Sequence, residues 1–257
     1  MTDLKSSNFF IVATELLKAP GKPWSSGGFQ KQGVTKNVAS SILRILEKKD
    51  VVEWAGGRRR GRGAYCVLRT PEMLLRQCVE NFMDQDLRRE SFVSNRSAEE
   101  IALALQEKGY EVFLGRFEGL PKEYRYVHDG RGEILCLNSK IFTLANRERL
   151  IWELSLHHVS KGGNIFISIP RHKKFLKYQT LEQDGVKIPS LFYTYLSLKN
   201  WDYPMAQAQI EHLEKCLKKE GKFFVQGMGL VKTMNSRVLL KITKKRHPRE
   251  NGDPGAQ

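Results

Sequence analysis

The stretch VTKNVASSILRILEKKDVVEWAGGRRRGRGAYCVL, residues 34–68, decides the fold of the first part of the chain. Its first half repeats apolar residues at helical spacing, in a stripe formed by Val38, Ile42, Ile45 and Leu46. Its second half contains two short β-like runs, 51–54 and 64–68, separated by glycines and arginines. The stretch therefore predicts a helix followed by a β-hairpin with a basic loop.

Two more helices are predicted ahead of this stretch. Residues 7–18 (SNFFIVATELLK) have helical periodicity, and Pro20-Gly21 ends it. Residues 29–32 predict a short second helix closed by Gly33. Helix, short helix, turn, helix and basic hairpin is the order of a winged helix-turn-helix, which we predict for residues 1–70.

The third helix and the hairpin supply the candidate binding residues. The faces of the helix away from the apolar stripe carry Thr35, Lys36, Asn37, Ser40, Ser41 and Arg44. Such a helix can enter a major groove, where Asn37 could pair with an adenine. The hairpin carries Arg58, Arg59, Arg60 and Arg62, which suit phosphates or a narrow minor groove. The alternative is an ordinary solvated helix face and a charged hairpin tip that prevents edge pairing.

The charge of the chain favours a polyanionic partner. The formal net charge is +15 and the sequence pI is about 9.7. Residues 1–70 hold 13 Lys and Arg against 5 Asp and Glu, so the N-terminal quarter has a higher density of positive charge than the rest of the chain. Because lysines and arginines release counterions from nucleic acid, double-stranded DNA is the predicted partner.

Location and redox chemistry are predicted from what the sequence lacks. It has neither an apolar run of about eighteen residues nor the pattern of a signal peptide, so we expect a cytoplasmic protein with no membrane partner. The four cysteines have no C-x-x-C pair and no close histidine cluster, and they are Cys66, Cys78, Cys136 and Cys216. They are predicted to be buried thiols, and no metal or cofactor is expected.

The rest of the chain predicts a larger mixed domain, so the fold class is α+β. A helical connector is expected at 71–94, from an amphipathic pattern over 72–90, and an α+β domain at 95–246. Helices are predicted at 95–108, 145–158 and 205–219. β-like runs occur at 110–114, 124–128, 133–137, 164–169, 222–226 and 237–243. The polar tail at 247–257 is predicted to be disordered.

No catalytic motif is complete. Asp84 and Asp86 form a D-x-D without the Gly-Ser helix start of a nucleotidyltransferase, and we interpret them as the polar side of a helix. Asp129 and Glu133 suggest a D…E-x-K nuclease, but Leu135 replaces the lysine, and a turn explains Asp129. The adjacent His157 and His158 point to different faces of a predicted helix, one of them half-buried, and cannot form a metal pair.

A resemblance to a known family comes from the last third of the chain. Residues 185–196 read GVKIPSLFYTYL, followed by Leu198-Lys199 and a helix with Ala206, Ala208, Leu213 and Leu217. This is similar to the AbiEi-like antitoxin regulators of type IV toxin-antitoxin systems. They also begin with a winged helix, to which residues 24–69 correspond. The usual Gly-Arg before the helix is replaced by Asp202-Tyr203-Pro204, and residues 95–160 match only loosely.

The resemblance implies a non-enzymatic repressor that binds repeats in its own promoter and pairs functionally with a nucleotidyltransferase toxin. Two other classes remain open. One is an enzyme associated with nuclease or nucleotidyltransferase chemistry, with a divergent site in the C-terminal domain. The other is an adaptor whose winged helix docks protein. The incomplete carboxylate motifs argue against the first, and the arginine-rich hairpin argues against the second.

Overall fold

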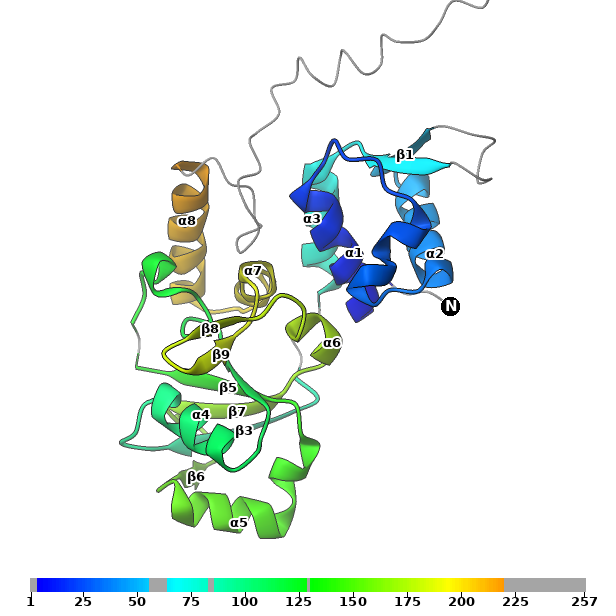
Figure 1. The fold of residues 1–257 in the computed structure, drawn as a ribbon. Helices are drawn as coiled ribbons and strands as arrows, with labels where there is room; N and C mark the ends of the chain where they lie inside the picture. Colours follow the sequence, from blue (N-terminus) through cyan, green and yellow to red (C-terminus); the bar gives the residue numbers. More distant parts are fainter. Residues whose placement is uncertain (1–3, 56–63, 83–85, 129, 220–257) are drawn as a thin grey trace, which may run out of the picture.

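The computed structural model describes residues 4–55, 64–82, 86–128 and 130–219 (Figure 1). It confirms a mixed α+β fold, with a helical N-terminal part, a five-stranded mixed sheet and two C-terminal helices. The predicted strands at 222–226 and 237–243 and the tail at 247–257 lie outside the described residues. No helix within the described ranges has the length and apolar character needed to span a bilayer.

The N-terminal elements follow the predicted order. They are α1 (Ser7–Lys18), the 3-10 helix η1 (Ser26–Gln32), α2 (Lys36–Lys48), β1 (Val52–Ala55) and β2 (Tyr65–Leu68). Ser6 Oγ accepts a hydrogen bond from the Phe9 N–H and caps α1. Gly33 ends η1 with φ 75°, a left-handed conformation that glycine adopts without steric cost. The helix at 7–18 is therefore confirmed with its predicted bounds. The short second helix and the strand pair are confirmed with small shifts, since η1 begins at Ser26 and the strands are 52–55 and 65–68.

The buried face of α2 is rotated from the predicted one. Ala39, Ile42, Leu43 and Leu46 are its buried residues, whereas Val38 and Ile45 are only partly buried. α2 packs against α1, η1 and β1 together, so its contact surface is centred on the small Ala39 and on Leu43. Periodicity alone identified the buried side of the helix but not the centre of the buried face.

Three local predictions for the middle of the chain are wrong. The helix predicted over 72–90 ends early, because α3 covers Pro71–Asn81 and Arg88–Val93 forms β3. The helix predicted to His158 ends at Glu153, and His157–Val159 forms β6. Residues 124–128 form no strand, and the 3-10 helix η2 covers Lys122–Tyr124. In the first case, pairing with a strand on each side outweighs the helical pattern.

The central sheet has the order β4-β5-β7-β3-β6. Its remaining strands are β4 (Val112–Gly115), β5 (Gly132–Cys136) and β7 (Ile165–Ile169). β5 and β7 are parallel, and the other neighbours are antiparallel. The helices α4 (Ala98–Glu107) and α5 (Leu144–Glu153) and the 3-10 helix η3 (Ser139–Phe142) contribute side chains to the sheet's core.

The last elements complete a second core. They are the short α6 (Lys173–Leu176), the hairpin β8 (Leu181–Gln183) and β9 (Val186–Ile188), α7 (Leu191–Lys199) and α8 (Pro204–Lys219). All residues of α7 except Lys199 are buried, so this helix packs within the core on all sides. The apolar residues of α7 therefore form part of the hydrophobic core.

One hydrophobic core crosses the predicted domain boundary at residue 70. Phe10 of α1 packs on Phe82, His172 and Phe175, with ring centroids 4.9 to 5.3 Å apart. Lys174 Nζ of α6 also donates to Asn8 Oδ1 and to the Gly33 carbonyl, both at 2.7 Å. The N-terminal elements are thus tied to α6 and α7, and experiments on them are best made with the whole chain.

Three of the four cysteines are buried thiols, as predicted. Burial raises the pKa of Cys66 to about 12 and that of Cys136 to about 11, and it raises the pKa of Cys78 further still. Cys216 is half-exposed, with its Sγ 3.4 Å from His212 Nε2. The described residues contain no group of three or more His, Cys, Asp or Glu that could hold a metal ion.

His172 is a buried titratable group at the junction of the two halves. Its side chain is 3% exposed and lies between the rings of Phe10 and Phe82. Burial, and secondarily the charge of Arg171, lowers the pKa of His172 from 6.5 to about 4. The folded state therefore holds a neutral imidazole at a pH where the unfolded chain already binds the proton.

We expect His172 to make the protein less stable in mild acid. A lowered folded-state pKa contributes stability that is complete above pH 6.5 and is lost as the pH falls towards 4. Relative to His172→Leu, the wild-type free energy of unfolding should fall by about 3 kcal/mol over this interval. Urea unfolding of both proteins across the interval measures it. If the free energies of unfolding of the two proteins changed with pH in parallel, the lowered pKa of His172 would be contradicted. Asp86 affects stability in the opposite direction, but it is present in both proteins, so its effect cancels in the comparison.

Candidate functional site

The exposed face of α2 holds the six helix residues predicted from sequence. Thr35 is the N-cap residue of α2, and Lys36, Asn37 and Arg44 are exposed, while Ser40 and Ser41 are partly buried. Ser40 and Ser41 lie three and four residues after Asn37, and Arg44 lies four and three residues after them, so the four residues form one stripe. The Ser41 hydroxyl donates to the Asn37 carbonyl at 3.0 Å, so it is partly engaged within the helix.

The cations of this face are available to an outside partner. Among the described residues, neither Lys36 nor Arg44 forms an ion pair, and the Asn37 side chain makes no hydrogen bond. The buried face of the same helix is apolar, so the polar stripe cannot turn inward without breaking the core. α2 therefore presents a rigid, polar and basic surface.

The base of the hairpin is held firmly beside α2. β1 and β2 pair in register from Val52 with Leu68 to Ala55 with Tyr65. Trp24 adds two backbone hydrogen bonds with Cys66, of 2.8 and 2.7 Å, and its ring stacks on Phe29 of η1 at 4.7 Å. The predicted contact residues of the loop, Arg58, Arg59, Arg60 and Arg62, lie outside the described residues.

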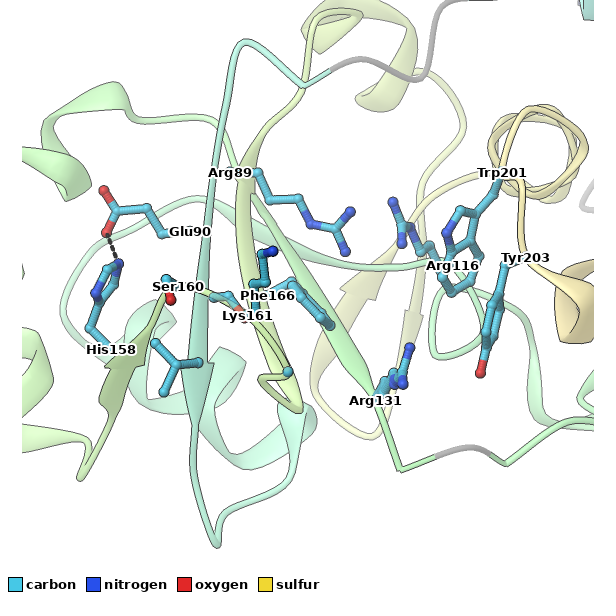
Figure 2. A pocket seen from close by; sticks show the side chains of 13 residues that line it. Arg89, Glu90, Arg116, Arg131, His158, Ser160, Lys161, Phe166, Trp201 and Tyr203 are labelled. Carbon is cyan, nitrogen blue, oxygen red and sulfur yellow. Dashed lines mark ion pairs between the residues drawn. The ribbon is translucent and has the colours of Figure 1, made fainter.

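A second site, which the sequence did not reveal, is a cavity of about 490 Å³ beside the central sheet. Figure 2 shows the side chains of Arg89, Arg116 and Arg131 directed to the same space, between Phe166 and the pair Trp201 and Tyr203. Lys161 and His158 lie along the other side of the cavity. The lining comes from strands β3, β6 and β7, from the loops around β4 and β5, and from the α7–α8 connection.

Each arginine of the cavity lies against an aromatic ring. The guanidinium carbon of Arg89 is 4.2 Å from the Phe166 centroid, and that of Arg116 is 3.9 Å from the Trp201 centroid. Arg131 lies 5.5 Å from the ring of Tyr203, which stacks on Trp201 at 4.6 Å. These cation–π contacts orient the planar guanidinium groups before any ligand arrives.

A buried carboxylate cluster lies next to these arginines. Glu133 Oε2 is 3.0 Å from Arg116 Nε, and its Oε1 is 3.8 Å from Arg89 Nε and accepts from the Ser168 hydroxyl at 3.2 Å. Burial, and then the charge of Glu133, raises the pKa of Asp86 to about 7, against the opposing effect of Ser168 and the arginines. Glu133 therefore serves as the internal counter-ion of the arginines.

This cluster corrects the interpretation of Asp86. The residue was predicted on the solvated face of a helix, but it follows the end of α3 and interacts with Glu133 and Ser168 at the sheet. Its predicted companion Asp84 lies outside the described residues, as does Asp129, the predicted companion of Glu133. The helix pattern misassigned Asp86 because the chain turns into β3 soon after it.

The two adjacent histidines also differ from their prediction. His157 and His158 lie on β6 and are both exposed, so neither is half-buried on a helix. His158 Nε2 is 4.0 Å from Glu90 Oε2, and Glu90 is also paired with Arg88 at 2.6 Å and with Arg147 at 3.0 Å. His158 is thus a neighbour of an already neutralised carboxylate.

The cavity could not be read from local sequence. Arg89, Arg116 and Arg131 are separated by more than a dozen residues each and share no periodic spacing. The nearest signal is the pair of aromatic residues Trp201 and Tyr203.

Comparisons of the chain with protein-family models, with curated proteins and with solved structures found no match.

Proposed function

We propose that the protein is a DNA-binding transcriptional regulator whose N-terminal elements act as a winged helix-turn-helix. The observation that carries the proposal is the exposed polar face of α2, with Lys36, Asn37 and Arg44 beside a hairpin whose loop sequence is rich in arginine. In this proposal α2 enters the major groove, and the hairpin loop contacts the sugar-phosphate backbone or the minor groove.

The roles of the two parts differ. Asn37 offers an amide that can both donate to and accept from an adenine edge, so it is assigned to base recognition together with Thr35, Lys36 and Ser40. Ser41 and Arg44 extend the same face. The arginines of the loop, Arg58, Arg59, Arg60 and Arg62, are assigned to phosphates, where contacts position the protein without reading sequence.

The resemblance to AbiEi-like antitoxins makes the proposal more specific. It supports a repressor of its own toxin-antitoxin operon, without catalytic activity, paired with a nucleotidyltransferase toxin. The internal neutralisation of Glu133 by Arg116 and its bond from Ser168 support a non-enzymatic reading, because these contacts occupy its oxygens. The adaptor alternative becomes an outcome of the DNA-binding test below.

Replacing Asn37 by alanine is expected to reduce sequence preference. Loss of a bidentate base contact should cost about 1 to 3 kcal/mol on the preferred site and much less on unrelated DNA. The probe is a duplex from the upstream region of the chain's own gene, compared by titration with a duplex of scrambled sequence. Asn95→Ala, another exposed asparagine, which lies after β3, is the matched control and should bind both duplexes as wild type does.

Equal weakening on both duplexes would contradict base recognition by Asn37. Absence of binding by the wild-type chain, even at low salt, would overturn the DNA proposal and favour the adaptor. Both variants should first show an unchanged melting temperature, since these are exposed substitutions.

A further inference from the structure

We propose that the cavity lined by Arg89, Arg116 and Arg131 is a binding site for a small phosphorylated ligand of nucleotide size. The proposal does not depend on DNA binding by α2. The cavity of about 490 Å³ lies in the range of small-molecule sites, which is roughly 300 to 1,000 Å³. It is also built mainly from sheet strands and their adjoining loops, which suit a preformed site.

The charge of the residues that line the cavity favours an anionic ligand. Three arginines and Lys161 line it, against the single carboxylate Glu90. Glu90 is already paired with Arg88 and Arg147, and Glu133 is paired with Arg116, so the charge of each carboxylate is matched by an arginine. The surplus of positive charge is therefore directed into a partly open cavity, where the field is less screened than on a flat surface.

The geometry selects phosphate among anions. A guanidinium presents a planar fork of N–H donors that matches two oxygens of a phosphate. Arg116 is only 7% exposed and is held between Glu133 and Trp201, so its orientation is set before binding. Arg89 packs on Phe166 and Arg131 packs on Tyr203, around the same space, as Figure 2 shows. Three such forks suit the several oxygens of a diphosphate better than one carboxylate.

The cavity also has groups for the rest of the ligand. Phe166 is half-buried, and Val159 lines the cavity on the other side of Ser91, so an apolar or ring-shaped part can be covered. The hydroxyl of Ser91 is buried at the same lining and has no hydrogen-bond partner among the described residues. An unpartnered buried hydroxyl is costly.

The test measures binding of inorganic pyrophosphate and of ADP to the full chain by calorimetry. Two rim residues, Arg131 and Lys161, are exposed and lie outside the buried Glu133 cluster, so the double variant Arg131→Gln with Lys161→Gln should fold normally. We expect its affinity for both probes to fall by about tenfold or more. Arg76→Gln with Lys187→Gln removes the same two charges from exposed positions elsewhere and should bind as wild type.

A second readout locates the ligand. The indole N–H resonance of Trp201, assigned with Trp201→Phe, should shift on addition of either probe, whereas that of the exposed Trp152 should not. Tighter binding of ADP than of pyrophosphate would show that the apolar lining is used. Equal affinity of the rim variant and its control would overturn the proposal. It would also be overturned if neither probe bound while the rim variant weakened only duplex DNA, since the arginines would then contact backbone phosphates.

Discussion

The triple variant Arg58→Ala, Arg59→Ala and Arg60→Ala is expected to weaken binding to duplex DNA of any sequence. Each arginine that neutralises a phosphate contributes about 0.9 to the slope of log affinity against log salt. Loss of three contacts should therefore reduce the slope by up to about 3 and the affinity at 0.1 M salt by about 10² to 10³-fold. Titrations at several salt concentrations, with the upstream and the scrambled duplex, measure both quantities.

The matched control removes three cations from elements other than the N-terminal ones. Lys108 caps the C-terminus of α4, and Arg149 and Lys187 lie on α5 and β9, all of which are separate from α2 in Figure 1. Their combined replacement by alanine lowers the net charge equally and should change the salt slope by much less. Equal effects in the two triple variants would mean that only net charge matters. Full affinity of the Arg58, Arg59 and Arg60 variant would contradict the role of the hairpin loop.

The variant Phe10→Ala is expected to lower the free energy of unfolding of the whole chain by about 3 to 5 kcal/mol. The ring of Phe10 is fully buried and packs on Phe82, Phe175 and His172, so its removal leaves a cavity between α1 and α6. Because this junction joins the N-terminal elements to the rest, the loss should reach both parts. Urea unfolding, with the midpoint and the slope fitted separately, measures it.

Trp152→Ala is the control for the removal of an aromatic ring. Its side chain is 87% exposed, so the free energy of unfolding should change by less than about 0.5 kcal/mol. A small effect of Phe10→Ala, similar to that of the control, would show that the two parts do not depend on this contact. Two separate unfolding transitions in the variant would show that the parts had become independent.

Local sequence was a good guide wherever an element is stabilised within its own segment. The helical periodicity of residues 7–18 and the glycine at Gly33 predicted α1 and the end of η1, because spacing and caps act over a few residues. The helix predicted at 205–219 is likewise found as α8. The exposed face of α2 followed from the same periodicity, so the candidate DNA-binding residues of this helix could be selected in advance.

Predictions from local sequence failed where pairing with distant strands determines the secondary structure. The helical pattern predicted over 72–90 overlaps β3 (88–93), whose backbone groups pair with β7 on one side and β6 on the other. The partners lie about 70 residues further along the chain, and no local pattern encodes such pairing. Asp86 was misplaced for the same reason, since its surroundings depend on where β5 and β7 lie.

The sequence by itself determined the periodic helices, the polar face of α2, the basic hairpin loop and the excess of positive charge. Only the tertiary structure decided that Arg89, Arg116 and Arg131 meet around one cavity, with Glu133 as their buried counter-ion. It also decided that one core joins α1 to α6 and α7 across residue 70. The two sets differ because the interactions behind them have different ranges. Helical spacing and caps act between residues that are close in the chain, whereas burial and charge pairing depend on residues that are close only in space.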